Sequence, residues 1–247
     1  AGSVKLVPVA SPDHPLALFS YQTLSPQDYS RYISAYTVIK AEWLSFDLGK
    51  PNIERFGAKN QDWLPSLMEL RGEKDSQGHR LLASLEIHDP EAVQSGRAAY
   101  PQKMYMELLF PETEPLIHLN FYWFQKPATR LPESLWLTFH PITSDQQGWM
   151  LDKSGESVSP FDVVAGGGRH MHAVTKQFSY KDQDHSFTVE PLDAPVIALG
   201  EKSPLNFSKS QPDLSGGVHC NLFNNAWGTN YIMWYGENAR FRFVLRA

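Results

Sequence analysis

The chain has 247 residues and a net charge of −5, with 42% hydrophobic and 20% charged residues. Its single cysteine, Cys220, excludes an intrachain disulfide and a metal site built from clustered cysteines. The mild acidity argues against a nucleic-acid surface, which needs a basic stripe, and we expect no nucleic-acid partner. No apolar run approaches the ~20 residues of a membrane helix, so we expect no membrane partner either.

The first predicted helix spans residues 25–48 and forms a helical lead-in. Ser25 is a good capping residue, Pro26 suits the first helical position, and Asp28 stands three residues after the cap. Large side chains then recur at helical spacing, at Tyr29, Tyr32, Ile33, Tyr36 and Trp43. Such a stripe more often packs on a sheet than binds a ligand. The helix is expected to end by residues 49–51, where a glycine and a proline stand.

Beyond the helix the sequence predicts loops with short helical turns up to residue 78, and then a series of strands. After residue 78 the apolar positions repeat with a period of two, which is typical of strands, and clusters of Pro and Gly separate them. The expected strands, with an extended lead-in at 15–22, lie at 81–88, 104–110, 116–124, 134–140, 171–178, 185–190, 196–199, 218–223 and 240–246. We therefore predict a mainly β fold, an antiparallel sandwich, in a single domain over residues 1–247.

The stretch at residues 216–235 combines many amides with several aromatic rings. Amides supply both donors and acceptors for hydroxyl groups, and tryptophan supplies an apolar platform for a sugar ring. The candidate carbohydrate-binding residues here are His219, Asn221, Asn224, Asn225, Asn230 and Trp227. The alternative is that asparagine and glycine serve turn geometry while the tryptophans fill the core.

A glycine triplet at 166–168 brings two further candidate carbohydrate-binding residues, Arg169 and His170, to a loop tip. A strand pattern follows the triplet, whereas a phosphate-binding loop leads into a helix, so we interpret the triplet as a flexible turn. His170 and His172 stand at strand spacing and would need a third metal ligand. His219 or Asp162 could supply one, but paired histidines on a strand are more often residues of its polar face, and we expect no metal in this chain.

No catalytic group can be assigned from the residues. Acids are plentiful, but no spacing fixes the pair of carboxyls that glycoside hydrolysis requires. The chain has no serine nucleophile elbow, and Cys220 has no convincing partner that would make it a thiolate. The catalytic residues are therefore left open.

Several segments resemble the C-terminal region of a family of uncharacterised proteins, domain of unknown function family 5054, which itself resembles the family 38 glycoside hydrolases, the α-mannosidases. The segments that carry the resemblance are 18–25, 28–29, 48–51, 149–153, 158–164, 169–174, 192–195, 211–219 and 224–230. It implies a β-supersandwich of the galactose-mutarotase type, behind an N-terminal catalytic domain of the same polypeptide. It also implies that zinc, if used, and the nucleophilic acid belong chiefly to that domain, whose His-x-Asp motif occurs nowhere in this chain.

Three functions follow as hypotheses, in order of preference. The first is the C-terminal β-sandwich domain of an α-mannosidase-like glycoside hydrolase, inactive alone, which supports carbohydrate binding and completes the active-site cleft. The second is an independent carbohydrate-binding module, and the third is a mutarotase-like sugar epimerase. The start Ala1-Gly2-Ser3, without a methionine, fits a cloning scar or a processed C-terminal fragment of a larger chain.

Overall fold

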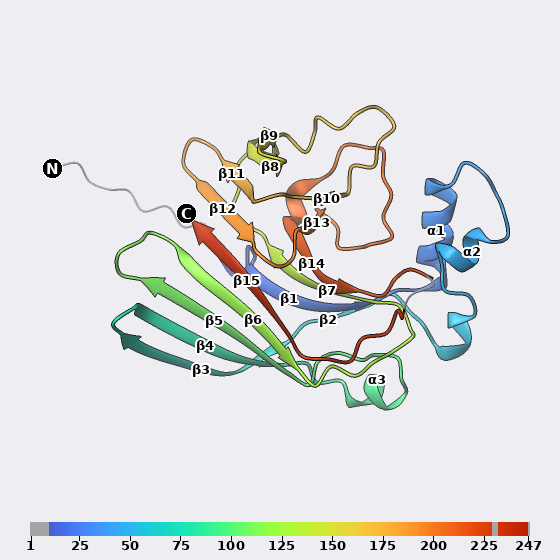
Figure 1. Cartoon of the computed structure of the whole chain (residues 1–247), viewed down its shortest axis with the longest axis horizontal. Coiled ribbons are helices and arrows are strands. Elements are labelled where there is room, and N and C mark those ends of the chain that lie inside the picture. The colour runs from blue at the N-terminus through green and yellow to red at the C-terminus, as the bar shows by residue number, and fades with distance from the viewer. Residues whose placement is uncertain (1–9, 229–231, 247) are drawn as a thin grey trace.

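The computed structural model describes residues 10–228 and 232–246. In this part of the chain two antiparallel sheets, of six and nine strands, pack against each other (Figure 1). The expected mainly β fold and antiparallel sandwich are confirmed. The helices gather at one end of the sandwich, around the ends of β1 (Leu16–Thr23) and β2 (Gln61–Trp63) (Figure 1).

Both sheets combine segments that lie far apart in the sequence. In spatial order the smaller sheet contains β10 (Met171–Ala173), β13 (Val196–Leu199), β14 (Val218–Asn224), β7 (Glu133–Phe139), β1 and β2. The larger sheet contains β3 (Ser66–Asp75), β4 (Gly78–Glu86), β5 (Lys103–Pro111), β6 (Ile117–Phe124), β15 (Ala239–Arg246), β12 (Ser186–Pro191), β11 (Phe178–Lys181), β8 (Trp149–Lys153) and β9 (Glu156–Val158). The last strand, β15, therefore fills a central position between β6 and β12.

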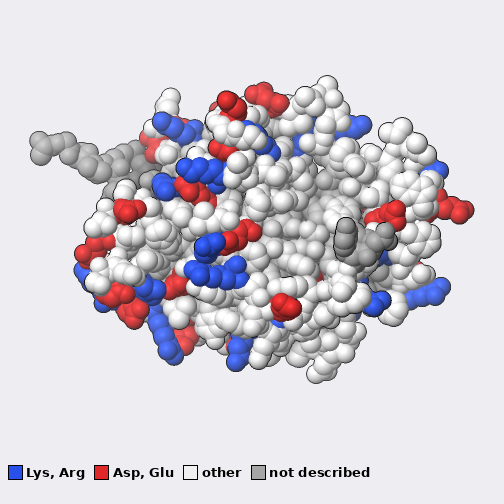
Figure 2. All heavy atoms as spheres, in the orientation of Figure 1, with Lys and Arg blue, Asp and Glu red and all other residues white. Residues whose placement is uncertain are grey.

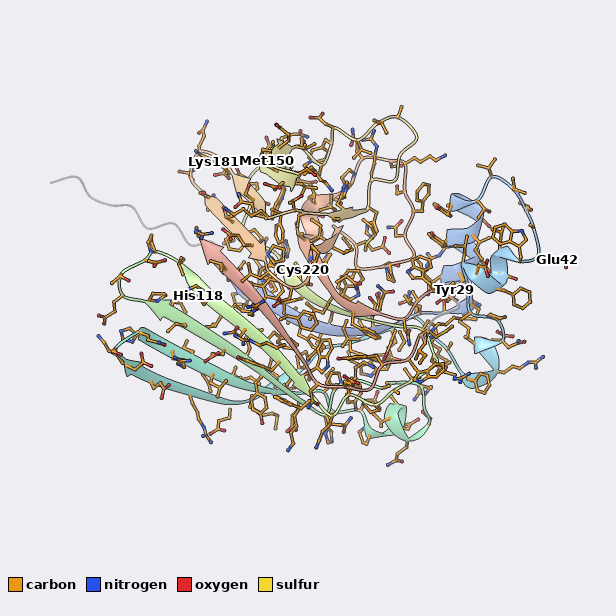
Figure 3. The ribbon with its side chains drawn as sticks, viewed as in Figure 1. Tyr29, Glu42, His118, Met150, Lys181 and Cys220 are labelled. Carbon is orange, nitrogen blue, oxygen red and sulfur yellow. The ribbon has the colours of Figure 1, made fainter. Side chains whose placement is uncertain are left out.

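Aromatic side chains from both sheets form the core. Phe19 of β1 stacks on Phe121 of β6 with 4.8 Å between ring centroids, and Phe139 of β7 packs against Phe243 of β15. Cys220 lies on β14 inside the sandwich (Figure 3). Burial raises the pKa of its thiol, so this cysteine is a core residue and has no thiolate character.

The predicted helix begins as expected but ends early. In α1 (Pro26–Tyr36) the Ser25 side chain accepts from the backbone of Asp28, whose carboxylate accepts in turn from the Ser25 backbone. The chain leaves the helix at Thr37, where three β-branched residues in a row disfavour it. The other helical elements are α2 (Leu44–Asp47), α3 (Pro90–Gln94), and the 3-10 turns Ile53–Phe56, Gln146–Gly148 and Leu214–Gly216.

The expectation of loops from residue 51 to 78 was wrong, because β2 and β3 lie there. Every residue of β3 is exposed, so the strand lacks the one-sided alternation that would mark it in the sequence. The strand expected at 171–178 is limited to β10, with Phe178 as the first residue of β11. The rest of β11, and all of β8 and β9, were not predicted. No helix in the described residues is long and apolar enough to cross a bilayer.

Candidate functional site

His219 and Asn225, two of the candidate sugar contacts, lie in the interior. His219 is 4% exposed, and its Nε2 lies 3.0 Å from the Gly200 carbonyl oxygen, which can only accept. Its Nδ1 lies 2.8 Å from the Thr138 hydroxyl, which can donate. These partners fit a neutral imidazole, and burial lowers the pKa of His219 to about 4.

Asn225 bonds the loop that joins β6 to β7. Its side-chain nitrogen donates to the carbonyls of Thr129 and Leu131, at 3.0 Å each. Its side-chain oxygen accepts from the backbone of Glu133 at 2.7 Å, and its own backbone N–H donates to the Glu133 carbonyl. Both ends of the amide are therefore used inside the protein, which matches the turn-geometry interpretation of this asparagine.

The other described candidate residues between 216 and 235 differ in burial, and the two asparagines among them form hydrogen bonds inside the protein. Asn221 is buried and donates to the Ser134 hydroxyl, while half-buried Asn224 donates to the Asn221 side chain at 2.7 Å. Trp227 is half-buried and packs against Tyr32 of α1, with 5.2 Å between ring centroids. Asn230 lies outside the described residues. No finding tests the sugar-binding role, which stays a prediction.

Arg169 and His170 lie elsewhere, at a polar pocket of about 370 Å³. Arg169 donates to the carbonyls of Phe161 and Val163, and buried His170 to the carbonyl of Ser203. His172 donates to the Arg169 carbonyl, so the two histidines point to separate acceptors. Within residues 10–228 and 232–246 no three His, Cys, Asp or Glu side chains come together as a metal site.

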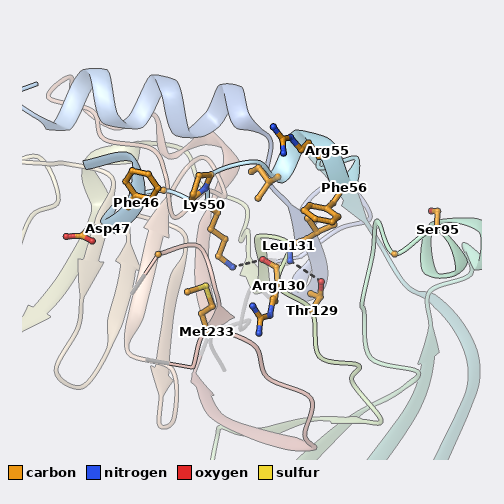
Figure 4. A pocket seen from close by; sticks show the side chains of 15 residues that line it. Phe46, Asp47, Lys50, Arg55, Phe56, Ser95, Thr129, Arg130, Leu131 and Met233 are labelled. Carbon is orange, nitrogen blue, oxygen red and sulfur yellow. Dashed lines mark hydrogen bonds between the residues drawn. The ribbon is translucent and has the colours of Figure 1, made fainter. Parts of the chain in front are cut away.

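A larger pocket, of about 930 Å³, lies at the helical end of the sandwich (Figure 4). Its walls are the segment from Phe46 to Phe56, the Ser95-Gly96 turn, residues 129–131, and two residues, Gly228 and Met233, of the amide-rich stretch 216–235, called the closing stretch below. A Cβ added to Gly228 would lie 2.0 Å from the Phe46 carbonyl oxygen, so only glycine permits this approach. The closing stretch thus supplies one wall of the pocket, through residues other than its asparagines.

A buried ion pair closes the base of the loop that carries residues 129–131. The Lys126 ammonium lies 2.5 Å from the Glu133 carboxylate, and it also donates to the carbonyls of Pro127 and Tyr235. The Tyr21 hydroxyl donates to the second carboxylate oxygen at 2.8 Å. Burial raises the pKa of Glu133 to about 7, whereas Lys126 and Tyr21 favour its ionised form.

Lys50 connects this loop to the opposite wall of the pocket. The side chain is 8% exposed, and its ammonium donates to the Arg130 carbonyl at 3.1 Å (Figure 4). Loss of hydration lowers the pKa of Lys50 to about 8, and the nearby Glu133 carboxylate opposes that change. Together with Asn225, Lys50 satisfies all three carbonyls of residues 129–131, which fixes the loop backbone.

The pocket is cationic in a protein that is acidic as a whole. Lys50, Arg55 and Arg130 line it against one acid, Asp47. In the face shown in Figure 2 the charged side chains gather mainly at the end of the sheets remote from α1 and α2, and the middle carries few of them. The local excess of positive charge favours an anionic ligand.

Sequence reasoning missed Lys50, Lys126, Arg130 and Glu133 as site residues. Lys50 stands in the segment 48–51, which contributed to the family resemblance, but nothing in that turn indicates a pocket. A usable signal was Glu133, an acid at the start of the largely apolar strand β7, because lysine and glutamate are almost never fully buried without a partner. The strand pattern alone does not identify Lys126 as that partner.

Comparison with other proteins agrees with the resemblance expected from the sequence. Residues 3–118 match the family model described as "Domain of unknown function (DUF5054)". No curated protein sequence gives a significant match. Two solved structures from Enterococcus faecalis have the same fold over 94% of this chain: an alpha-mannosidase and a protein in the glycosyl hydrolase family 38, both with a TM-score of 0.51, at 9% and 8% identity.

The chain spans about a quarter of the length of these two proteins, 25% and 26%. At this identity the likeness concerns the fold, and the finer assignment to the galactose-mutarotase type stays a prediction. The expected resemblance is thus confirmed: to the domain of unknown function over residues 3–118, and to family 38 glycosyl hydrolase structures in the fold of nearly the whole chain.

Proposed function

We propose that this chain is the C-terminal β-sandwich domain of an α-mannosidase-like glycoside hydrolase. It supports carbohydrate binding and completes a cleft whose catalytic groups come from an N-terminal domain of the same polypeptide. The observation that carries the proposal is the fold likeness, which covers nearly all of this chain but only a quarter of the two Enterococcus faecalis proteins. Zinc, if the whole protein uses it, would be held by the N-terminal domain.

An exposed apolar segment supports docking of such a domain. Between α1 and the 3-10 turn at Ile53–Phe56, large apolar side chains face solvent at Val38, Ile39, Trp43, Phe46 and Phe56, which are 58–99% exposed. Contiguous apolar patches on a protein surface generally mark an interaction site. Phe46 and Phe56 also line the larger pocket, so a domain docked here would enclose that pocket from the open side. Ligand sites commonly form at such domain interfaces.

The test compares the longest natural polypeptide that holds this chain with the 247-residue chain alone. Both are assayed on aryl α-mannosides and on a panel of other aryl glycosides. We expect hydrolysis only by the longer polypeptide, and a loss of activity when Trp43 and Phe46 are both changed to serine. The control is Met68→Ser on β3, which is exposed to a similar degree and lies outside the segment.

Two results would overturn the proposal. Hydrolysis by the chain alone would place a complete catalytic site inside it. A longer polypeptide that is inactive on every glycoside would remove the hydrolase role, and sugar binding by the chain alone would then favour an independent binding module.

A further inference from the structure

We propose that the pocket lined by Lys50, Arg55 and Arg130 binds a sugar that carries an acidic group, either a carboxylate or a phosphate. The Arg130 guanidinium holds the anion, Lys50 and Arg55 add positive charge to the pocket, and the exposed rings of Phe46 and Phe56 pack against the sugar. The identity of the ligand as a sugar rests on the proposed function. The requirement for an anion rests on the side chains of this pocket alone.

The guanidinium groups of the pocket lack polar partners among the described residues, whereas the other arginines there bond carboxylate, carbonyl or amide oxygens. In the described part of the chain six arginines form ion pairs with carboxylates: Arg31, Arg71, Arg80, Arg97, Arg242 and Arg246. Arg55 and Arg130 have no carboxylate partner among the described residues, although Asp47 lies on the same pocket. Two cations without counterions on one concave surface form a suitable site for an anionic group.

Arg130 is held in an orientation that suits this role. Its guanidinium lies over the Trp234 ring, 4.2 Å from the centroid. A guanidinium that contacts a ring in this way keeps N–H donors at its edge, and these donors match the two oxygens of a carboxylate or phosphate. The backbone beneath it is fixed by Lys50 and Asn225, so little order has to be created when a ligand binds.

Size and lining of the pocket agree with a ligand larger than an inorganic ion. The volume of about 930 Å³ lies in the range of sites for small organic molecules. In the view of Figure 4 the Lys50 ammonium lies between the side chains of Arg55 and Arg130, with Phe46 and Phe56 on either side. Cations and aromatic rings on one pocket suit a molecule that has both an anion and a ring.

Titration calorimetry on the 247-residue chain tests this with four probes: mannose, mannose 6-phosphate, glucuronate and inorganic phosphate. We expect one of the two acidic sugars to bind at least about tenfold more tightly than mannose and inorganic phosphate, and more weakly as salt is added. Whichever acidic sugar binds distinguishes a phosphate from a carboxylate ligand. Arg130→Gln and Arg55→Gln should each weaken that binding by about tenfold.

The matched control is Arg240→Gln. Arg240 also lies over an aromatic ring, that of Tyr122 at 5.6 Å, but it bonds Asn120 on the larger sheet and lies outside the pocket. This variant should bind as the natural chain does. Lys50→Met is a second pocket variant and should also bind more weakly.

Equal affinity for mannose and the acidic sugars would overturn the proposal, as would equal affinity for inorganic phosphate or a loss of binding in Arg240→Gln. Failure of both acidic sugars to bind at millimolar concentration would overturn it as well. The measurement is independent of hydrolysis, so an inactive longer polypeptide would refute the proposed function without affecting this result.

Discussion

The Lys126 ammonium and the Glu133 carboxylate meet at 2.5 Å with neither side chain exposed to solvent. Removal of one member of a buried ion pair leaves the other charge without compensation, which typically costs about 3–5 kcal/mol. Replacement of both members by apolar groups removes two desolvated charges together and is often far less costly. The pair closes the loop that carries Arg130, so its stability bears directly on the pocket.

We therefore predict that Lys126→Met and Glu133→Leu each lower the free energy of unfolding by about 3–5 kcal/mol. The double variant should lose less unfolding free energy than the sum of the losses in the two single variants. Urea unfolding of the four proteins gives the coupling energy. Losses that simply add would show that the two groups stabilise the fold independently. Lys202→Met with Asp62→Leu, a partly exposed ion pair at 2.8 Å, is the control and should show a coupling of at most ~1 kcal/mol.

Asn225→Ala should destabilise the protein whether or not a sugar is present. The change leaves two loop carbonyls and the Glu133 amide without partners, and a buried unsatisfied group typically costs about 1–3 kcal/mol. We expect a loss of about 2–4 kcal/mol in urea unfolding. Asn206→Ala removes one bond, to exposed Glu201, and should change stability by less than about 0.5 kcal/mol. An unchanged unfolding midpoint in Asn225→Ala would contradict the structural role.

Gly228→Ala should separate the closing stretch from the opposite wall of the pocket, which Phe46 and Gly49 form. The new methyl group would lie 2.0 Å and 2.4 Å from the carbonyl oxygens of Phe46 and Gly49, so the backbone must move. We expect a loss of about 1–3 kcal/mol in thermal or urea unfolding. In Gly72→Ala on β3 the new methyl group would lie 3.3 Å from the flexible Leu81 side chain and 3.9 Å from the Arg80 carbonyl oxygen, so this variant should be nearly neutral. Equal stability of the two variants would show that this contact does not hold the wall.

His219 makes the protein less stable in acid. Its pKa is about 4 in the folded protein, below the ordinary 6.5, so the unfolded chain takes up a proton first as the pH falls. The contribution of neutral His219 to the free energy of unfolding is fully present above about pH 6.5. As the pH falls from about 6.5 to about 4, this contribution is lost at roughly 1.4 kcal/mol per pH unit. His219→Gln keeps a donor and an acceptor but cannot titrate, so its unfolding free energy should fall less steeply with acid. Exposed His79→Gln should keep the natural slope.

The sequence predicts the sandwich well where one face of an element is buried. Ser25 and Asp28 mark the start of α1 because a capping box is a local interaction. The alternation around Phe121 and Phe243 marks β6 and β15 because one face of each strand lies in the core. In β3 both faces are exposed, so this signal is missing and the strand was taken for a loop.

The site was harder to predict because its bonds join distant residues. An asparagine that binds a sugar hydroxyl and one that binds loop carbonyls look alike in a sequence, and Asn225 forms its bonds with residues more than 90 positions away. Lys50 acts on the Arg130 carbonyl across 80 positions. The positive charge of the pocket exists only after the fold brings Lys50, Arg55 and Arg130 together.

The central place of β15 in the larger sheet has a consequence for synthesis of the protein. Until Ala239–Arg246 has left the ribosome, β6 and β12 have no strand between them and each presents a free edge. Unpaired strand edges promote aggregation during folding. A chain that stops shortly before residue 239 should therefore be retained by chaperones or accumulate as inclusion bodies, even though it holds every described residue that lines the pocket.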